Sequence, residues 1–254
     1  MIDIENNDGV RSIWLNSPPS NSLTPELLDA LRGAVRAAGA ERSVRCLLLG
    51  SRLPKYFSSG IDIDAIFAPP PARRIEIFMN VLETHRELAE LPKPTIAALP
   101  GYAMLAGWIM AMACDFRIMA EKTGRVALSE IRFGLTPTEF MLRRLREMGA
   151  GMNAAKQLVL RGKTLKAQEA LDGGLVDQLV PAAELAECAL QEAKKLAKLP
   201  PETYASIKRD LAASAGVREG LWERSMAEFR RVYESPEAQA GLTAMREKRT
   251  PVYP

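Results

Sequence analysis

Two stretches of this sequence set small residues at a turn beside an apolar run: Phe57-Ser58-Ser59-Gly60-Ile61-Asp62-Ile63 and Gly101-Tyr102-Ala103-Met104-Leu105-Ala106-Gly107. At such turns backbone N–H groups can be exposed without bulky side chains in the way. Two N–H groups aimed at one point form an oxyanion hole, which stabilises a thioester or ester carbonyl as it becomes an enolate or a tetrahedral oxyanion. The two stretches therefore indicate acyl chemistry that needs no metal.

The composition allows a sizeable buried core. The chain has 254 residues, 47% of them apolar, which suits one large domain or one domain with an appendage. Its 34 basic and 31 acidic residues give a formal net charge of +3 and are interspersed along the sequence. We therefore expect no nucleic-acid partner, although the modest positive balance suits a ligand that bears phosphate.

The cysteines and the first residues bear on the cellular compartment. Cys46, Cys114 and Cys188 are odd in number and widely spaced, so we expect neither a disulfide framework nor a zinc site. Residues 1–5 lack the basic start and apolar block of a signal peptide, and no uncharged stretch reaches the length of a membrane span. The sequence therefore predicts a soluble, cytoplasmic protein with no membrane partner.

Short apolar runs alternate with helical patterns through the first two thirds of the chain. The pattern predicts buried strands at residues 10–15, 44–50, 95–99 and 116–120, and helices at residues 25–38, 106–113 and 167–171. Residues 175–180 form a short extended piece, and the proline-rich residues 68–72 predict a mobile loop or linker. These elements indicate an α/β core built from β-β-α units.

The last part of the chain is predicted to be helical. The pattern begins near Ala182, breaks at Pro200-Pro201, resumes as an amphipathic stretch from Arg218 to about Tyr233, and opens a final helix at Pro236. A helical section with little strand content is typical of a lid or of an oligomerisation element appended to the core.

The residue types exclude several mechanisms. The single histidine, His85, lies in a charged helical stretch, so we expect an ordinary helix-surface or interface residue rather than a member of a Ser-His-Asp or Cys-His device. No Walker loop or Gly-x-Gly-x-x-Gly fingerprint is present, so nucleotide hydrolysis and hydride transfer lack their usual phosphate cradle.

Two glutamates remain as candidate acids and bases. Glu130 follows a predicted strand among apolar residues, and burial there would raise its pKa toward the range of a general acid and base. The alternative is a capping residue, or an ion pair with Arg132 or Arg125. Glu139 is a second candidate, and its alternative role is that of a first-turn helix acid that follows a Thr138 cap.

These stretches, with several other pieces in the same order, resemble the crotonase superfamily, the enoyl-CoA hydratase/isomerase group, over essentially the whole chain. The other pieces are residues 17–23, 94–100, 114–118, 167–170 and 174–177. The resemblance implies a spiral core of β-β-α units that holds the CoA site, over residues 1–195, and a helical region for trimer formation and pocket closure, over residues 196–254. It also implies a homotrimer or hexamer, an acyl-CoA thioester as substrate, no cofactor beyond the CoA of that substrate, and no metal.

The resemblance also assigns site residues by position. The N–H groups of Ile61 and Ala106 match the oxyanion-hole donors, although the family usually has a glycine-rich run where this chain has Leu105-Ala106-Gly107. The residues expected to contact the substrate or its CoA are Ser59, Gly60, Asp62, Ile63, Gly107, Ile109 and Phe140.

The acid and base positions separate the activities within the family. Hydratases place one glutamate in the helix after the second turn and another further along the chain; here the first position matches Ile109, which cannot titrate, and the second matches Glu130. A single glutamate is similar to the Δ3,Δ2-enoyl-CoA isomerases, in which one base moves a proton from C2 to C4. We therefore predict an isomerase that uses Glu130. Two alternatives stay open: a hydratase or related lyase or hydrolase that pairs Glu130 with Glu139, and a non-catalytic acyl-CoA-binding protein.

Overall fold

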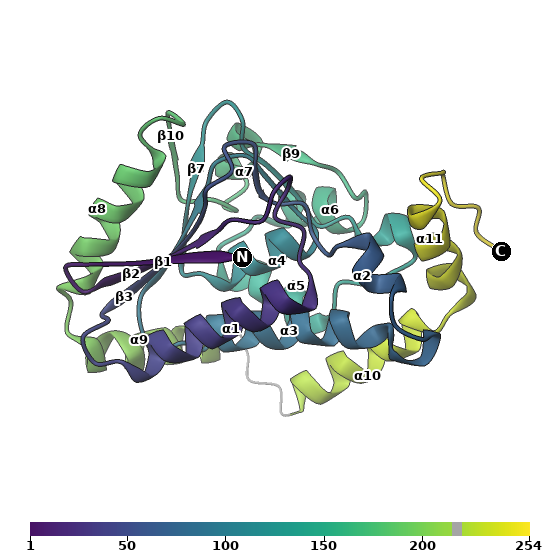
Figure 1. The fold of residues 1–254 in the computed structure, drawn as a ribbon, viewed down its shortest axis with the longest axis horizontal. Helices are drawn as coiled ribbons and strands as arrows, with labels where there is room; N and C mark the ends of the chain where they lie inside the picture. The colour runs from purple at the N-terminus through teal and green to yellow at the C-terminus, as the bar shows by residue number, and fades with distance from the viewer. Residues whose placement is uncertain (215–219) are drawn as a thin grey trace.

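Two β-sheets and the helices around them make up the computed structural model, which describes residues 1–214 and 220–254 (Figure 1). Within these residues the larger sheet has six strands, in the order β1-β2-β3-β5-β7-β10, and the smaller sheet has four, in the order β4-β6-β8-β9. The strands are β1 (Ile2–Asn7), β2 (Val10–Leu15), β3 (Cys46–Ser51), β4 (Tyr56–Ser58), β5 (Thr95–Leu99), β6 (Tyr102–Met104), β7 (Phe116–Ala120), β8 (Arg125–Ala127), β9 (Leu165–Lys166) and β10 (Gln178–Val180).

The helices surround these sheets and form the C-terminal part of the chain. They are α1 (Pro25–Ala40), α2 (Ile63–Phe67), α3 (Ile75–Ala89), α4 (Ala106–Ala113), α5 (Glu139–Glu147), α6 (Met152–Val159), α7 (Ala167–Asp172), α8 (Leu185–Ala197), α9 (Pro201–Ser214), α10 (Leu221–Tyr233) and α11 (Pro236–Arg246). Two short 3-10 turns are η1 (Pro71–Arg73) and η2 (Glu130–Phe133). In the described part of the chain, no helix is both long and apolar enough to cross a bilayer.

The chain repeats one path three times. It runs through a strand of the large sheet, then a strand of the small sheet, and then a helical segment: β3-β4-α2, β5-β6-α4 and β7-β8-η2. The strands β3, β5 and β7 are parallel neighbours, and so are β4, β6 and β8. Successive turns of the chain therefore stack, which confirms the predicted spiral of β-β-α units.

Helix α4 lies at the centre of this spiral. All eight of its residues are buried, as its uniformly apolar sequence requires. Helix α8 covers the other face of the large sheet, where its Leu185, Ala189 and Ala193 join Leu48 and Ile118 in a second apolar cluster. The central strands of the large sheet are thus buried on both faces, which accounts for their continuous apolar runs.

Most of the predicted elements are present with small shifts in their ends. The strands at residues 10–15, 95–99 and 116–120 and the helix at residues 106–113 have the predicted bounds, whereas β3 begins at Cys46 and α1 continues to Ala40. The predicted proline-rich loop is partly ordered, because Pro71 opens η1. Arg218, where the late amphipathic stretch was expected to begin, lies outside the described residues, and α10 is described from Leu221.

The C-terminal helices return to the core. Helix α10 packs against α3 and α5, and α11 packs against α2 and η2, so the end of the chain lies against elements that precede residue 148 (Figure 1). The sequence left open whether these late helices close a pocket or serve as an oligomerisation element. Phe229 of α10 and Leu242 of α11 line a cavity of their own chain.

Candidate active site

The site lies where the strands of the small sheet end. Ile61 follows β4, Ala106 follows β6, and Glu130 follows β8. Because these three strands are parallel neighbours, their carboxyl ends meet at one edge of the sheet, which is where parallel sheets generally place ligands. The structure accordingly brings Ile61, Ala106 and Glu130 into the lining of one cavity.

The first turn fixes the direction of the Ile61 N–H group. The N–H of Leu23 donates to the carbonyl of Gly60 at 2.8 Å, and the N–H of Asp62 donates to the carbonyl of Leu23 at 3.0 Å. In this parallel pairing the residue between the two bonded peptides directs its own N–H away from Leu23. The Ile61 N–H group is therefore available to a ligand.

The second turn supplies Ala106. This residue is the first of α4, where a backbone N–H has no partner within the helix and lies at the positive end of the helix dipole. The two turns touch at Gly60, which has a φ of +102° and where a Cβ would lie 3.3 Å from Leu105 Cβ and 3.7 Å from the Ala106 nitrogen. Glycine at position 60 therefore lets the two donor turns approach each other.

Leu105 occupies a strained position between these donors. Its φ is +50° and its ψ is −122°, a conformation that costs a residue with a side chain about 1–3 kcal/mol. The Leu105 N–H donates to the carbonyl of Ala127 at 2.8 Å, and the Leu105 carbonyl accepts from the N–H of Ile109 at 2.9 Å. These two bonds hold the strained residue in place.

Glycine at position 107 has a structural reason of its own. A Cβ on Gly107 would lie 2.6 Å from the carbonyl oxygen of Ser58, so only glycine lets α4 pack directly on β4. Gly107 is not part of the cavity lining. Its predicted contact with substrate stays a prediction, while its role in bringing α4 to β4 follows from the packing.

Glu130 is buried in apolar surroundings. The residue is 8% exposed, and within the described residues its Oε2 atom has no hydrogen-bond partner. Removal from water disfavours the charged carboxylate and raises the pKa of Glu130 from 4.5 to about 7. Arg125, a predicted ion-pair partner, donates instead to the carbonyls of Lys122 and Gly124. Near neutral pH Glu130 can therefore both accept and deliver a proton.

The cavity beside Glu130 is apolar. It measures about 680 Å³, part of which is open to solvent. Side chains from α3, α10 and α11, including Phe78, Phe229 and Leu242, form its walls, and the only ionisable side chain among its described lining residues is Glu130. Such a cavity suits the apolar part of an acyl chain.

Ile109 is at the position where the resemblance to hydratases predicts a second carboxylate. It lies on the turn of α4 that follows the Ala106 donor, is 8% exposed and lines the cavity. An isoleucine can neither hold nor activate a water molecule. The part of the cavity wall that α4 contributes after the Ala106 donor is therefore apolar.

The other predicted site residues lie outside the lining of this cavity. Glu139 is half-buried at the start of α5, where Thr138 caps the helix by accepting from the Met141 N–H at 3.3 Å. Phe140 packs edge-on against the rings of His85 and Trp222. The remaining predicted contacts that do not line the cavity are Ser59, Gly60, Asp62, Ile63 and Gly107; their roles toward the substrate stay predictions.

Asp62 and Ser59 connect the first turn to the loop before α1 through their side chains. The Asp62 carboxylate caps α2 by accepting from the Ala65 N–H at 3.0 Å, and it accepts from the Ser22 hydroxyl at 2.9 Å. The Ser59 hydroxyl is hydrogen-bonded to that of Ser20 at 3.0 Å. These side chains join the loop before α1 to the turn that carries Ile61.

His85 is not the surface or interface residue that its charged neighbours suggested. The side chain is completely buried, and its Nδ1 atom lies 2.7 Å from the carbonyl oxygen of Ile109. Nδ1 is the donor because a carbonyl can only accept. Burial lowers the pKa of His85 to about 3, so the ring is neutral. The expectation was wrong because the buried stripe Phe78, Val81, His85 and Leu88 of α3 runs between half-buried charged side chains.

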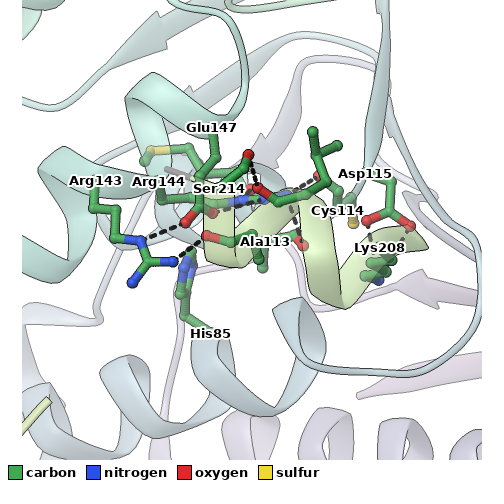
Figure 2. A network of polar contacts seen from close by, with 12 residues as sticks. His85, Ala113, Cys114, Asp115, Arg143, Arg144, Glu147, Lys208 and Ser214 are labelled. Carbon is green, nitrogen blue, oxygen red and sulfur yellow. Dashed lines mark hydrogen bonds and ion pairs between the residues drawn. The ribbon is translucent and has the colours of Figure 1, made fainter. Parts of the chain in front are cut away.

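The far end of α4 is held by cationic side chains (Figure 2). The Arg144 guanidinium donates to the last carbonyls around the helix end, namely those of Met112 at 2.7 Å, Ala113 at 3.3 Å and Cys114 at 2.7 Å. Carbonyls at a helix C-terminus lack intrahelical partners and carry the negative end of the dipole. Arg144 thus fixes the helix whose other end presents the Ala106 donor.

The loop after α4 also fastens α9. The Asp115 carboxylate accepts from Lys208 Nζ at 3.0 Å and from the Tyr204 hydroxyl at 3.0 Å, and Figure 2 shows Asp115 and Lys208 facing each other. Asp115 also accepts from the Thr95 N–H at 3.0 Å. This residue therefore joins β5, the end of α4, and α9.

Helix α11 fixes the turn that carries Glu130. A Cβ on Gly241 would lie 2.2 Å from the carbonyl oxygen of Phe133, and a Cβ on Gly134 would lie 2.6 Å from the carbonyl carbon of Glu237. Below 3.0 Å such contacts force a shift. The Tyr253 hydroxyl also donates to the Arg132 carbonyl at 2.7 Å. The η2 turn and α11 are thus in direct backbone contact.

Several contributors to the site could not be assigned from the sequence. They are Leu105, beside the Ala106 donor, and the side chains of Leu242 and Met245, one helical turn apart on α11, all of which line the cavity. The spacing of Leu242 and Met245, which places both on one face of a helix, was the sequence signal that could have indicated their shared position. No group of three or more His, Cys, Asp or Glu side chains in the described ranges is placed to hold a metal ion.

Comparison with known proteins identifies the family. A family model described as Enoyl-CoA hydratase/isomerase matches residues 5–254, so the chain belongs to the enoyl-CoA hydratase/isomerase family of the crotonase superfamily. A probable enoyl-CoA hydratase of Bacillus subtilis (strain 168) is 30% identical over 250 residues, which cover 96% of this chain and 95% of that protein. An enoyl-CoA isomerase/hydratase of Mycosarcoma maydis is 28% identical, covering 96% and 92% of the two chains.

A solved structure agrees with the fold. The structure described as methylmalonyl-CoA decarboxylase in complex with 2-nitronate-propionyl-CoA superposes with a TM-score of 0.86 at 25% identity, covering 100% of this chain and 98% of that chain. The three relatives are named for different reactions of acyl-CoA thioesters. Family membership therefore confirms the predicted fold and the acyl-CoA chemistry, and the reaction itself is a separate question.

Gly241→Ala is expected to lower the turnover of enoyl-CoA thioesters. The added Cβ would collide with the Phe133 carbonyl and displace the turn that carries Glu130, and a shift of about 1 Å in a reacting group can cost about 10²-fold in rate. The control is Gly33→Ala on α1, where a Cβ meets nothing within 4 Å. Steady-state kinetics of both variants check the expectation, and equal kcat values would contradict it.

Glu130 is expected to make the free energy of unfolding fall as the pH rises from 4.5 to about 7. In that range the folded chain holds the proton and the unfolded chain does not, so the stabilisation is complete below the lower pKa and lost above the higher one. At about 1.36 kcal/mol per pKa unit, the loss is at most about 3 kcal/mol. Urea unfolding of wild type and Glu130→Gln across this range measures it; a constant difference between the two proteins would refute the assignment.

Proposed function

We propose that this protein is a Δ3,Δ2-enoyl-CoA isomerase, which moves a double bond in an acyl-CoA thioester from C3–C4 to C2–C3. The observation that carries the proposal is a cavity in which Glu130 is the only ionisable side chain among the described lining residues, beside two available N–H groups. One group that can gain and lose a proton near neutral pH is what a proton shift within a substrate requires.

The two backbone donors would bind the thioester oxygen. The N–H groups of Ile61 and Ala106 lie on turns that touch at Gly60, and both residues line the cavity. Hydrogen bonds from fixed donors stabilise the negative charge that collects on this oxygen when a proton leaves C2. These donors therefore make the C2 proton more acidic without a metal.

Glu130 would carry the proton. Its carboxylate accepts the C2 proton, and the electron pair of the broken C–H bond delocalises onto the thioester oxygen as a dienolate. The resulting carboxylic acid then delivers the same proton to C4, a double bond forms between C2 and C3, and the carboxylate is restored. Its pKa of about 7 suits both half-reactions, because neither protonation state is strongly favoured at neutral pH.

The apolar walls would suppress addition of water. The cavity that contains Glu130 and the two donors is lined by Leu105 and by Ile109 of α4. Phe229 of α10 lines it as well. A dienolate that is surrounded by hydrocarbon side chains has no activated water with which to react. The same walls accept the hydrocarbon part of the acyl chain. A homotrimer or hexamer, a cytoplasmic location, and the absence of a metal or further cofactor stay predictions.

Hydration of a 2-enoyl-CoA is the second candidate. The names of relatives favour it, among them the probable enoyl-CoA hydratase of Bacillus subtilis (strain 168). It would require a second group to position water beside Glu130, and Glu139 is the glutamate that the sequence offers. Against it stands Ile109 in the cavity wall.

Glu130→Gln is expected to lower kcat for isomerisation of 3-hexenoyl-CoA by about 10²–10⁴-fold, the usual contribution of a general acid and base. Calorimetric titration with hexanoyl-CoA should show nearly unchanged binding, because glutamine has a similar shape. Glu139→Gln is the matched control and should keep the wild-type rate. An undiminished rate in Glu130→Gln would overturn the proposal, and so would binding of hexanoyl-CoA by a wild type that isomerises nothing.

The hydratase candidate is tested with 2-hexenoyl-CoA. Loss of the conjugated thioester absorbance measures addition of water. We expect none in wild type. Hydration that is fast in wild type and lost in Glu139→Gln would establish the second candidate in place of the first.

The isomerase should also show a dependence on pH with a definite sign. Because Glu130 must begin as a carboxylate, kcat/KM for 3-hexenoyl-CoA should rise as the pH passes through about 7. The control is the Glu139→Gln variant, which should give the same profile. A profile flat between about pH 6 and about pH 8 would rule out Glu130 as the base whose ionisation limits the reaction.

A further inference from the structure

Leu105 stands where the two donor turns meet. A Cβ on Gly60 would lie 3.3 Å from Leu105 Cβ, and Leu105 directly precedes the Ala106 donor. The leucine side chain lines the same cavity as Ile61, Ala106 and Glu130. It is thus an apolar group at the end of the cavity where the thioester would be held.

The position of this side chain is set by the backbone. The φ of +50° is one that glycine adopts freely and leucine does not, so the leucine contributes its side chain at the expense of backbone strain. Hydrogen bonds to Ala127 and from Ile109 hold its peptide groups on both sides. The side chain therefore cannot be moved aside by a rotation of the backbone without breaking the start of α4.

The placement of Leu105 limits what can be attached to the carbon next to the thioester. An oxygen bound by the Ile61 and Ala106 N–H groups is bonded to the thioester carbon, which carries the CoA sulfur on one side and C2 on the other. C2 begins the acyl chain, and Leu105 lines the apolar cavity that suits that chain. We propose that the Leu105 side chain excludes substituents at C2, so that the substrates are acyl-CoA thioesters unbranched at that carbon. This inference rests on the proposed function for its binding mode.

The test measures binding rather than turnover, with saturated thioesters that cannot isomerise. Calorimetric titration compares hexanoyl-CoA with racemic 2-methylhexanoyl-CoA. Wild type should bind the unbranched thioester at least about 10-fold more tightly, the lower limit for one methyl group in a close-fitting pocket. Leu105→Ala should reduce this ratio to below about 3-fold, because it removes the obstructing atoms.

Two further variants keep the test decisive. Leu105→Gly removes the same side chain and also relieves the positive φ, so it replaces the alanine variant if that protein does not fold. Leu242→Ala enlarges the cavity on its α11 wall and should keep the wild-type ratio for the two thioesters.

The outcomes separate this inference from the proposed reaction. Equal binding of both thioesters by wild type, or an unchanged ratio in the Leu105 variants, would overturn the role of Leu105 whether or not the protein isomerises 3-hexenoyl-CoA. A ratio that falls equally in Leu242→Ala would also overturn it, since the discrimination would then reflect cavity volume alone. Loss of isomerase activity with a preserved binding ratio would count against the reaction only.

Discussion

Direct contact between α4 and β4 determines the geometry of the site. Gly107 places the first turn of α4 against the carbonyl of Ser58, the last residue of β4, and the chain continues from there through Ser59 into the turn of Gly60 and Ile61. The two donors therefore take their spacing from backbone packing and not from side chains. This is why an alanine can stand at position 106: the donor is the N–H group, and its direction is set by the helix.

Burial of a single charge-bearing group gives the site its chemical character. The same apolar walls that would receive an acyl chain withhold water from Glu130 and bring the pKa of its carboxyl to about 7. The neighbouring polar groups do not disturb this balance, because His85 is kept neutral by its own burial and the Arg144 guanidinium is turned to the carbonyls at the far end of α4. Proton affinity and substrate fit thus have one physical cause.

The sequence predicted those parts of the fold whose residues carry a strong local pattern. The central strands β2, β3, β5 and β7 are apolar runs that are largely buried, and α4 is apolar throughout, so their bounds could be predicted nearly to the residue. The edge strand β1 was not predicted, because most of its residues are polar and exposed. The strands of the small sheet are two or three residues long, which is too short for any periodicity, and they were not predicted. Glu130 could be singled out because its neighbours are apolar. His85 could not, because charged residues on both sides of it conceal the buried stripe of α3.

The contacts of the C-terminal helices lie beyond what sequence patterns record. Phe229 and Leu242 belong to amphipathic helices whose apolar faces could have met another chain, and only the tertiary packing places them over the cavity. Similarly, Glu139 and Phe140 adjoin Thr138, which lines the cavity, yet the direction in which α5 begins takes both outside the lining. A shift of one residue along a helix start decides which side chain faces a site.

The closure of the cavity by α10 and α11 has a consequence for biosynthesis. The donor turns and the Glu130 turn are complete by residue 134, but one wall of the cavity and the backbone contact that holds η2 come from residues near the C-terminus. During synthesis the N-terminal part of a chain emerges and folds first. While translation continues, the nascent spiral therefore exposes the hydrocarbon lining of its unfinished cavity, and a ribosome-bound chain that lacks α11 has the acid and the donors without the enclosure that they require.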